Sequence, residues 1–280
     1  MSAADMGGFG GVAFYAGGQP TMSGRIARTA EDIPGMIETA RKEGSRIQGR
    51  HETFTLNRFV WQSSELFTTD HLSQAVEAER DNANIGSAVS ILSGLRPGLF
   101  VRNHIPAMIE GAAKRRNSAM RDALNKLSRS RPELFTTDDI PGLIEAGAGI
   151  AIMNLGSARP ELLTTGHLDK MVGDLKTDPF FDNVLDWLSD TDVTPWAVVS
   201  LFNGGHLSAI IDSMVNRIGS RQYRPVSDWE IDIVRNLARN RSELFTEDDV
   251  PKMRMIVRVN RRMESALSTL KEKKPDLFLP

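Results

Sequence analysis

Four of the five histidines in this chain recur at one position of a short sequence motif: His71, His104, His167 and His206. Histidine is a common metal ligand and general base, so a stack of motif copies would align these side chains in a row. Neighbouring packed helices lie about 8–10 Å apart, however, and a zinc–nitrogen bond is only about 2 Å long. Such a row cannot converge on one ion. We therefore predict no metal site and no cofactor, and expect the histidines to cap short helices, with partner binding as the alternative role.

Aspartate replaces histidine at this position in the other copies, at Asp32, Asp139 and Asp249. Paired carboxylates such as Asp138-Asp139 can perform acid–base chemistry, but carboxylates at a helix start are also favoured by capping and by the helix dipole. The chain has no cysteine and no Gly-x-Ser-x-Gly, His-Glu-x-x-His or P-loop motif. We therefore predict a protein that is not an enzyme. The alternative is an enzyme whose site lies within residues 187–206.

Basic side chains form the second group of candidate binding residues, in two clusters: Lys114, Arg115, Arg116 and Arg121, and then Arg258, Arg261 and Arg262. Contacts from such residues to phosphates would give nucleic-acid binding that weakens with salt. The formal net charge of the chain is −2, so no overall field attracts it to nucleic acid. We expect the clusters to contact another protein, with a nucleic acid as the alternative partner.

A repeated sequence unit positions all of these residues. Each copy has a Leu-Phe pair, a few small polar residues, an acid or histidine, and an aliphatic residue, as in the segment 134–140. The pairs at Leu66, Leu99, Leu134, Leu162, Leu201, Leu244 and Leu277 lie 28 to 43 residues apart, which is the length range of stacked helix pairs (the second member at position 163 is Leu). An apolar residue recurs seven positions before most of these leucines, with others three and four positions earlier, as on one helix face.

Prolines mark the boundaries within each unit. Arg131-Pro132 and its equivalents end one helix, because proline cannot continue a helix without losing a hydrogen bond. We expect the Leu-Phe pair that follows to fold back onto the core. Pro141 is tolerated only in the first turn of the next helix, so we place the N-cap at Asp138 rather than at Thr136. Four further large side chains are expected in the core: Trp61, Trp187, Trp196 and Trp229.

The fold class predicted from these patterns is all-α, with stacked helix pairs and no sheet, either as an α-solenoid or as a compact helical array. Residues 25–280 are expected to form the helical repeat domain of about seven units. The pattern is irregular around 178–206, where Thr194-Pro195-Trp196 is expected to begin an extra turn. Residues 1–24 include seven glycines and show no periodicity, so we expect a loosely packed or disordered tail.

The segments 123–144 and 266–278 resemble repeats of the HrpF/NolX translocon family of bacterial type III secretion. The shared features are an Ala- and Leu-bearing helix, a Pro-x-Leu-Phe turn and an Asp-Ile or Asp-Leu helix start. This resemblance implies an association with type III secretion. The segment 84–89, Asn-Ile-Gly-Ser-Ala-Val, is similar to the loop of TAL-effector-like DNA-binding repeats, which implies the nucleic-acid alternative.

The composition is typical of a globular protein, with 40% hydrophobic and 25% charged residues. No apolar run approaches the roughly 18–20 residues that span a bilayer, and the N-terminus lacks a signal-peptide pattern. We expect a bacterial protein that stays in the cytoplasm or is secreted without a cleavable signal. The leading hypothesis is a non-enzymatic scaffold that presents an extended surface to another protein. A bacterial effector or a type III secretion-associated protein is the expected setting.

Overall fold

The computed structural model describes residues 29–43, 50–114, 116–174, 180–218 and 226–279. Within these ranges the chain forms fifteen α-helices and several short 3₁₀ turns, and no strand. The predicted all-α fold without a sheet is therefore confirmed. The predicted tail, residues 1–24, and Arg115 lie outside the described residues, as do residues 178 and 179 of the irregular region. Among the described helices, none combines the length and apolar character needed to cross a bilayer.

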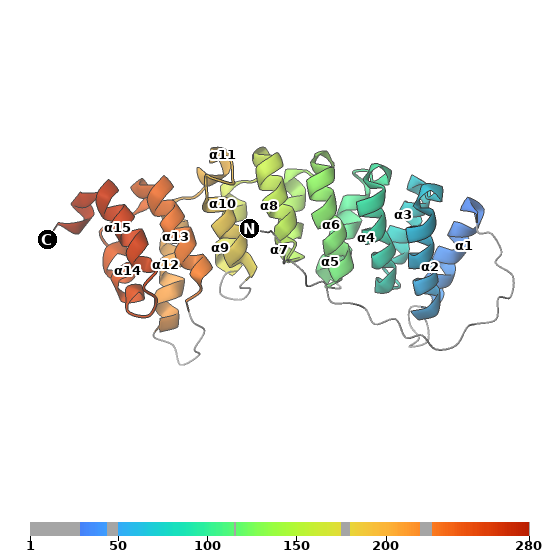
Figure 1. Ribbon diagram of the computed structural model, residues 1–280, viewed down its shortest axis with the longest axis horizontal. Helices are drawn as coiled ribbons and strands as arrows, with labels where there is room; N and C mark the ends of the chain where they lie inside the picture. The colour runs from blue at the N-terminus through green and yellow to red at the C-terminus, as the bar shows by residue number, and fades with distance from the viewer. Residues whose placement is uncertain (1–28, 44–49, 115, 175–179, 219–225, 280) are drawn as a thin grey trace, which may run out of the picture.

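The helices pack in two rows that run along an elongated molecule (Figure 1). Helices of the first row contact one another in the order α1 (Ile33–Glu43), α3 (Thr69–Ala78), α5 (His104–Lys114), α7 (Ile140–Glu145), α9 (Thr165–Asp174), α12 (Gly204–Ile218) and α14 (Asp249–Val257). The second row is α2 (Arg50–Ser63), α4 (Gly86–Leu95), α6 (Ser118–Ser130), α8 (Gly149–Ala158), α10 (Phe180–Ser189), α13 (Asp228–Asn240) and α15 (Met263–Lys273). Each first-row helix and the second-row helix that follows it form one pair.

This arrangement gives the array two edges. At the hairpin edge, a turn joins the two helices of one pair, as between α5 and α6 or between α14 and α15. At the Leu-Phe edge, every second-row helix except α10 is followed by a 3₁₀ turn, and all of these turns but the last lead to the next pair. These turns are η2 (Ser64–Leu66), η4 (Pro97–Leu99), η5 (Pro132–Leu134), η7 (Pro160–Leu162), η8 (Ser242–Leu244) and η9 (Pro275–Phe278). The hairpin edge lies at the bottom of Figure 1 and the Leu-Phe edge at the top.

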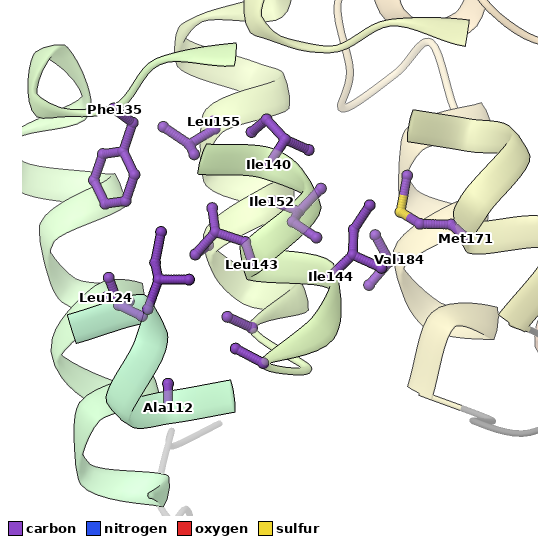
Figure 2. Close-up of a cluster of buried hydrophobic side chains, with 14 of the residues drawn as sticks. Ala112, Leu124, Phe135, Ile140, Leu143, Ile144, Ile152, Leu155, Met171 and Val184 are labelled. Atoms are coloured by element: carbon purple, nitrogen blue, oxygen red, sulfur yellow. The ribbon is translucent and has the colours of Figure 1, made fainter. Parts of the chain in front are cut away.

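One continuous hydrophobic core lies between the two rows. Figure 2 shows its middle part, where side chains from consecutive elements between α5 and α10 pack together: Ala112, Leu124, Phe135, Ile140, Leu143, Ile144, Ile152, Leu155, Met171 and Val184. The second member of the Leu-Phe pair is buried at Phe67, Phe100, Phe135, Leu163, Phe202 and Phe245. The predicted anchor role of this dipeptide is confirmed, because a buried aromatic ring at the end of one helix also contacts the beginning of the next pair.

An arginine follows four of the second-row helices, α4, α6, α8 and α13, and links each of them to an earlier part of the array. Arg131 is the residue after α6, and its backbone adopts φ −142° and ψ 53°, which ends the helix. Its Nη1 atom donates to the carbonyl oxygen of Pro97 at 3.0 Å, in the preceding Leu-Phe turn. Equivalent bonds join Arg96 to Ser64, Arg159 to Pro132 and Arg241 to Val199. The sequence pattern had indicated only that proline stops the helix, and not that the arginine before it spans two units.

The predicted N-cap at Asp138 is wrong. A 3₁₀ turn over Thr137–Asp139 precedes α7, and Asp139 closes a capping box with Thr136, accepting from the Thr136 N–H at 2.8 Å. The proline argument failed because the first turn is 3₁₀ rather than α, so that Pro141 lies within the first two residues of the α-helix that follows.

The regular order is interrupted once, between α10 and α12. Here the chain inserts the short helix α11 (Trp196–Val199), which begins after Pro195, as the sequence predicted for this segment. Thr194 anchors the preceding loop, because its side chain is 3% exposed and its Oγ1 donates to the Trp187 carbonyl oxygen at 2.7 Å. The insertion lies at the Leu-Phe edge (Figure 1) and lengthens the interval between Leu162 and Leu201.

Candidate interaction surface

All four candidate histidines cap the beginning of a first-row helix. The Nδ1 atom of His104 accepts a hydrogen bond from the Val101 N–H at 3.3 Å. Equivalent bonds to backbone N–H groups are made by His71, His167 and His206 at 3.2–3.3 Å. Asp32, Asp139 and Asp249 accept the corresponding bond through a carboxylate oxygen at 2.7–2.8 Å. The predicted capping role is confirmed, and it explains why histidine and aspartate alternate at this position: both present an acceptor to the same orphan N–H group.

Two of these histidines also contact the preceding pair through their other ring nitrogen. His206 Nε2 lies 2.7 Å from Asp169 Oδ1 on α9, and His104 Nε2 lies 2.8 Å from Ser73 Oγ on α3. Because Nδ1 accepts from the backbone, Nε2 carries the proton and donates in both contacts. Burial lowers the pKa of His104, and burial together with the nearby Lys170 lowers the pKa of His167. The ring nitrogens of His104 and His206 are therefore fully used within the fold.

The positions of these histidines support neither a metal site nor an enzyme site within residues 187–206. In the ranges that the structure describes, no group of three or more His, Asp or Glu side chains is arranged to hold a metal ion. In the region 187–206, His206 is 2% exposed and its nearest acidic neighbour is Asp169, which lies outside that region in sequence. The histidine row is thus a set of helix caps and inter-pair contacts rather than a convergent site.

The two basic clusters lie on the same edge of the array. Lys114 and Arg116 belong to the turn after α5, Arg121 lies in the second turn of α6, and Arg258 and Arg261 belong to the turn after α14. All are therefore at the hairpin edge (Figure 1). Four further steps of the array separate the two clusters, which is about 30–40 Å at the spacing of packed helices. They are two surfaces on one edge and not one patch.

The basic residues of these clusters differ in whether their charges are ion-paired, buried or exposed. Lys114 pairs with Glu110 at 2.7 Å, and Arg262 pairs with Asp228 at 3.0 Å. Arg121 is partly buried, with its Nε atom beneath the surface. Arg116, Arg258 and Arg261 are exposed and have no ion-pair partner among the described residues. Among the described members of the two clusters, the unpaired positive charge therefore lies on these last three side chains.

A shallow hollow of about 290 Å³ lies between α5 and α7 near the first basic cluster. Its floor contains Ile109 and Gly142, and a Cβ atom added to Gly142 would lie 2.6 Å from Ile109 Cγ2. Glu145 on its rim pairs with Lys170 at 2.7 Å. Of the other lining carboxylates, Glu110 pairs with Lys114 and Asp139 with Arg102, whereas Asp138 is exposed and has no ion-pair partner among the described residues.

The prediction that the tryptophans lie in the core is wrong for three of the four. Trp61, Trp196 and Trp229 are 64%, 54% and 50% exposed, whereas Trp187 is partly buried against the core. Helical periodicity places a side chain on a helix face, but only the packing of neighbours decides whether that face is covered. Exposed tryptophans are enriched where proteins contact partners, and of these three only Trp229, at the start of α13, lies at the hairpin edge with the basic clusters.

Asp186 on α10 is a residue that the sequence patterns did not single out. It faces α13, where Asn236 Nδ2 donates to its Oδ1 at 3.1 Å. Burial, and to a lesser extent the nearby carboxylates of Asp232 and Asp190, together raise the pKa of Asp186 to about 7, against the opposing effect of Arg235. An acidic run on the helix before the insertion was visible in the sequence, but its contact with α13 depends on how the rows pack.

No known protein family model matches this sequence, and no curated protein is significantly similar to it.

Proposed function

We propose that this protein is a non-enzymatic scaffold that presents one edge of an elongated helix array to another protein. The proposal depends on a contrast between two groups of polar residues, those bonded within the fold and those exposed at the hairpin edge. Buried caps and inter-pair contacts occupy His104 and His206, whereas Arg116, Arg258 and Arg261 at the hairpin edge are left exposed and unpaired. Stacked helix pairs commonly bind partners over such extended surfaces.

The chemistry of the edge favours a protein partner over a nucleic acid. The exposed arginines are grouped around half-exposed apolar side chains, Trp229 and Val259 in the second cluster. Arginine and tryptophan together are typical of binding hot spots. A duplex would instead require a continuous basic track along the edge, and the hairpin between α7 and α8 has no basic residue.

The first test is affinity capture with the folded full chain as bait, followed by purification of the captured protein and measurement of its dissociation constant. The bait R116E/R258E/R261E should lose the partner. The matched control E65K/D276K changes exposed residues at the opposite, Leu-Phe edge and should retain it. A partner that binds both variants equally, or a specific turnover abolished by one polar substitution, would overturn the proposal.

The nucleic-acid alternative is tested separately by fluorescence anisotropy with a labelled DNA duplex. Phosphate contacts would give binding that falls steeply between about 0.05 and 0.2 M salt. We expect no such binding. Salt-sensitive affinity that disappears in R258E/R261E would favour the alternative.

The bacterial setting, as an effector or a type III secretion-associated protein, is also part of the proposal. It is supported by the Pro-x-Leu-Phe turn that resembles HrpF/NolX repeats, which in this chain ends α6 and leads into α7. The test is export of the tagged full chain by a secretion-competent bacterium and by a matched strain with an inactive secretion ATPase. Equal amounts in both culture supernatants would contradict this setting.

A further inference from the structure

Asn203 is followed by two glycines at the start of α12, and it is the only asparagine in the chain that precedes a glycine. The side-chain amide of an asparagine can be attacked by the backbone nitrogen of the next residue. Glycine favours this reaction because it has no Cβ atom to hinder a close approach. Residues 203–205 are all exposed. Solvent therefore reaches the place where the reaction would occur.

The structure leaves both reacting groups available. Gly204 is the first residue of α12, so its N–H has no carbonyl partner within the helix. The side-chain oxygen of Asn203, Oδ1, accepts a hydrogen bond from the His206 N–H at 2.9 Å. Attack on the side-chain carbon places negative charge on this oxygen, and a donor that is already in position stabilises such a charge. The leaving group, Nδ2 of Asn203, donates no hydrogen bond to any described residue.

Asn117 provides a comparison within the same chain. It caps α6 through Oδ1, which accepts from the Ala119 N–H at 3.0 Å, much as Asn203 caps α12. Its Nδ2, however, donates to Glu79 Oε1 at 2.6 Å and to the Ala83 carbonyl oxygen at 2.9 Å. The residue is 8% exposed, and the next residue is a serine. Asn117 is therefore a cap of the same kind that lacks the features favouring attack.

We propose that Asn203 is a site of spontaneous deamidation, a slow and irreversible covalent modification of this helix start. The Gly204 nitrogen forms a bond to Cγ of Asn203 and loses its proton. The Cγ–Nδ2 bond breaks, and Nδ2 takes up a proton and leaves as ammonia. Water then opens the resulting succinimide ring at either of its carbonyl carbons. One opening gives aspartate, and the other gives isoaspartate, in which the main chain runs through the former side chain.

The two products have different effects on the contact between α9 and α12. Aspartate keeps an acceptor in the same place and is a preferred N-cap. The main chain of isoaspartate is one carbon atom longer and its free carboxylate is attached to Cα, so the cap geometry is lost. His206 depends on this cap, because its Nδ1 accepts from the Asn203 N–H at 3.2 Å while its Nε2 lies 2.7 Å from Asp169 Oδ1 on α9. Isoaspartate therefore releases the residue that links the two helices.

This inference goes beyond the proposed function, since it concerns the chemistry of one residue and holds for any partner. It is tested by incubating the full chain in neutral buffer at physiological temperature and mapping its peptides by mass spectrometry over time. The peptide containing Asn203 should progressively gain the mass of an amide-to-acid conversion, while the peptide containing Asn117 stays unchanged. Methylation by an isoaspartyl methyltransferase identifies the isoaspartate fraction. No conversion at Asn203, or equal conversion at both residues, would overturn the inference.

Two variants test the chemistry of the site. A Cβ atom added to Gly204 would lie 3.6 Å from the Leu244 carbonyl oxygen, an ordinary contact, so Gly204→Ala should fold and should slow the conversion several-fold. Asn203→Thr removes the reactive amide and introduces the residue that other copies hold at this place, such as Thr136 and Thr246. Its aged sample should lack the new acidic form in ion-exchange chromatography. Conversion of Gly204→Ala at the parent's rate, or equally abundant acidic forms from Asn203→Thr, would contradict the assigned reaction.

Hydrogen exchange tests the structural consequence. Ion exchange separates the aged chain into the parent and the acidic forms, and Asn203→Asp serves as the reference for the aspartate product. The amide of His206 should stay protected in the parent and in Asn203→Asp, because both keep an acceptor for it, and should exchange several-fold faster in the isoaspartate form. An isoaspartate form that exchanges as slowly as the parent would show that the modification leaves the link between α9 and α12 intact.

Discussion

Arg131 Nη1 donates a hydrogen bond to the carbonyl oxygen of Pro97 at 3.0 Å, across 34 positions of sequence. The same guanidinium pairs through Nε with Glu133 in its own turn. One side chain therefore ends its helix, closes its own Leu-Phe turn and attaches that turn to the preceding one. Repetition of this bond at Arg96 and Arg159 ties the Leu-Phe edge of four successive pairs together.

Replacing Arg131 with alanine should lower the free energy of unfolding by about 1–3 kcal/mol, because a partly buried carbonyl loses a charged donor. Arg131→Lys should recover only part of this loss, since a lysine cannot serve two acceptors with a rigid fork. Urea denaturation monitored by circular dichroism measures both. Arg129→Ala, two residues earlier and exposed, is the matched control; an equal loss in that variant would show that the inter-turn bond has no special role.

Phe135→Ala should cost roughly 3–5 kcal/mol, as for a large aromatic side chain truncated in a packed core. Phe135 is 1% exposed and lies in the cluster of Figure 2. The measurement is the urea midpoint at constant denaturant slope. Leu95→Ala, which removes a side chain that is 41% exposed, should shift the midpoint far less. Similar shifts for both substitutions would contradict the anchor role of the dipeptide.

His104 should make the fold sensitive to mild acid. Burial lowers its pKa below the ordinary value of 6.5, so the unfolded chain binds the proton more readily than the folded chain. Stability from this residue is complete above pH 6.5 and is lost as the pH falls through the lower pKa of the folded state. Thermal melts at pH 7.5 and pH 5, each about one unit or more from 6.5, measure this effect. The melting temperature should fall less between the two pH values for His104→Asn than for the parent chain.

The matched control for this prediction is His71→Asn. His71 caps an equivalent turn through Nδ1, but its side chain is only partly buried. Its substitution should leave the parent's acid sensitivity nearly intact. If His104→Asn loses as much stability on acidification as the parent chain, then protonation of His104 is not the cause.

Asp186 should have the opposite pH dependence. Its pKa is raised from 3.8 to about 7, mainly by burial, so the folded state holds the proton more tightly than the unfolded state. The stability that the neutral carboxyl contributes is fully present below pH 3.8 and is lost as the pH rises through about 7. Asp186→Asn should therefore stabilise the fold at pH 8 by about 1–2 kcal/mol, after allowance for partial solvent screening, and change it little at about pH 4. Asp276→Asn, at an exposed position, should give no such difference between the two pH values.

Much of the fold was predictable because its signals are local. The 3.6-residue periodicity of apolar side chains marks second-row helices such as α6, and the proline of Arg131-Pro132 marks where that helix ends. The Leu-Phe pair could be assigned to the core since a large apolar dipeptide after a helix has little else to pack against. The role of His104 and its equivalents as caps followed from their place at a helix start.

Features that depend on contacts between distant residues could not be read from the sequence. The exposure of Trp229 depends on which neighbours cover its helix, and the raised pKa of Asp186 depends on α13, which follows α10 by about 40 residues of chain. The N-cap at α7 was misplaced because the choice between a 3₁₀ and an α first turn depends on geometry that residue types do not specify.

The sequence by itself determined an all-α chain of stacked helix pairs, the proline-marked ends of its second-row helices and its buried anchors, because helix periodicity and proline act over a few residues. Only the tertiary structure decided that Arg131 reaches the preceding turn, that His206 reaches Asp169, and that both basic clusters share one edge. These relationships are set by the direction in which successive pairs stack, which is a property of packed surfaces and not of any one segment.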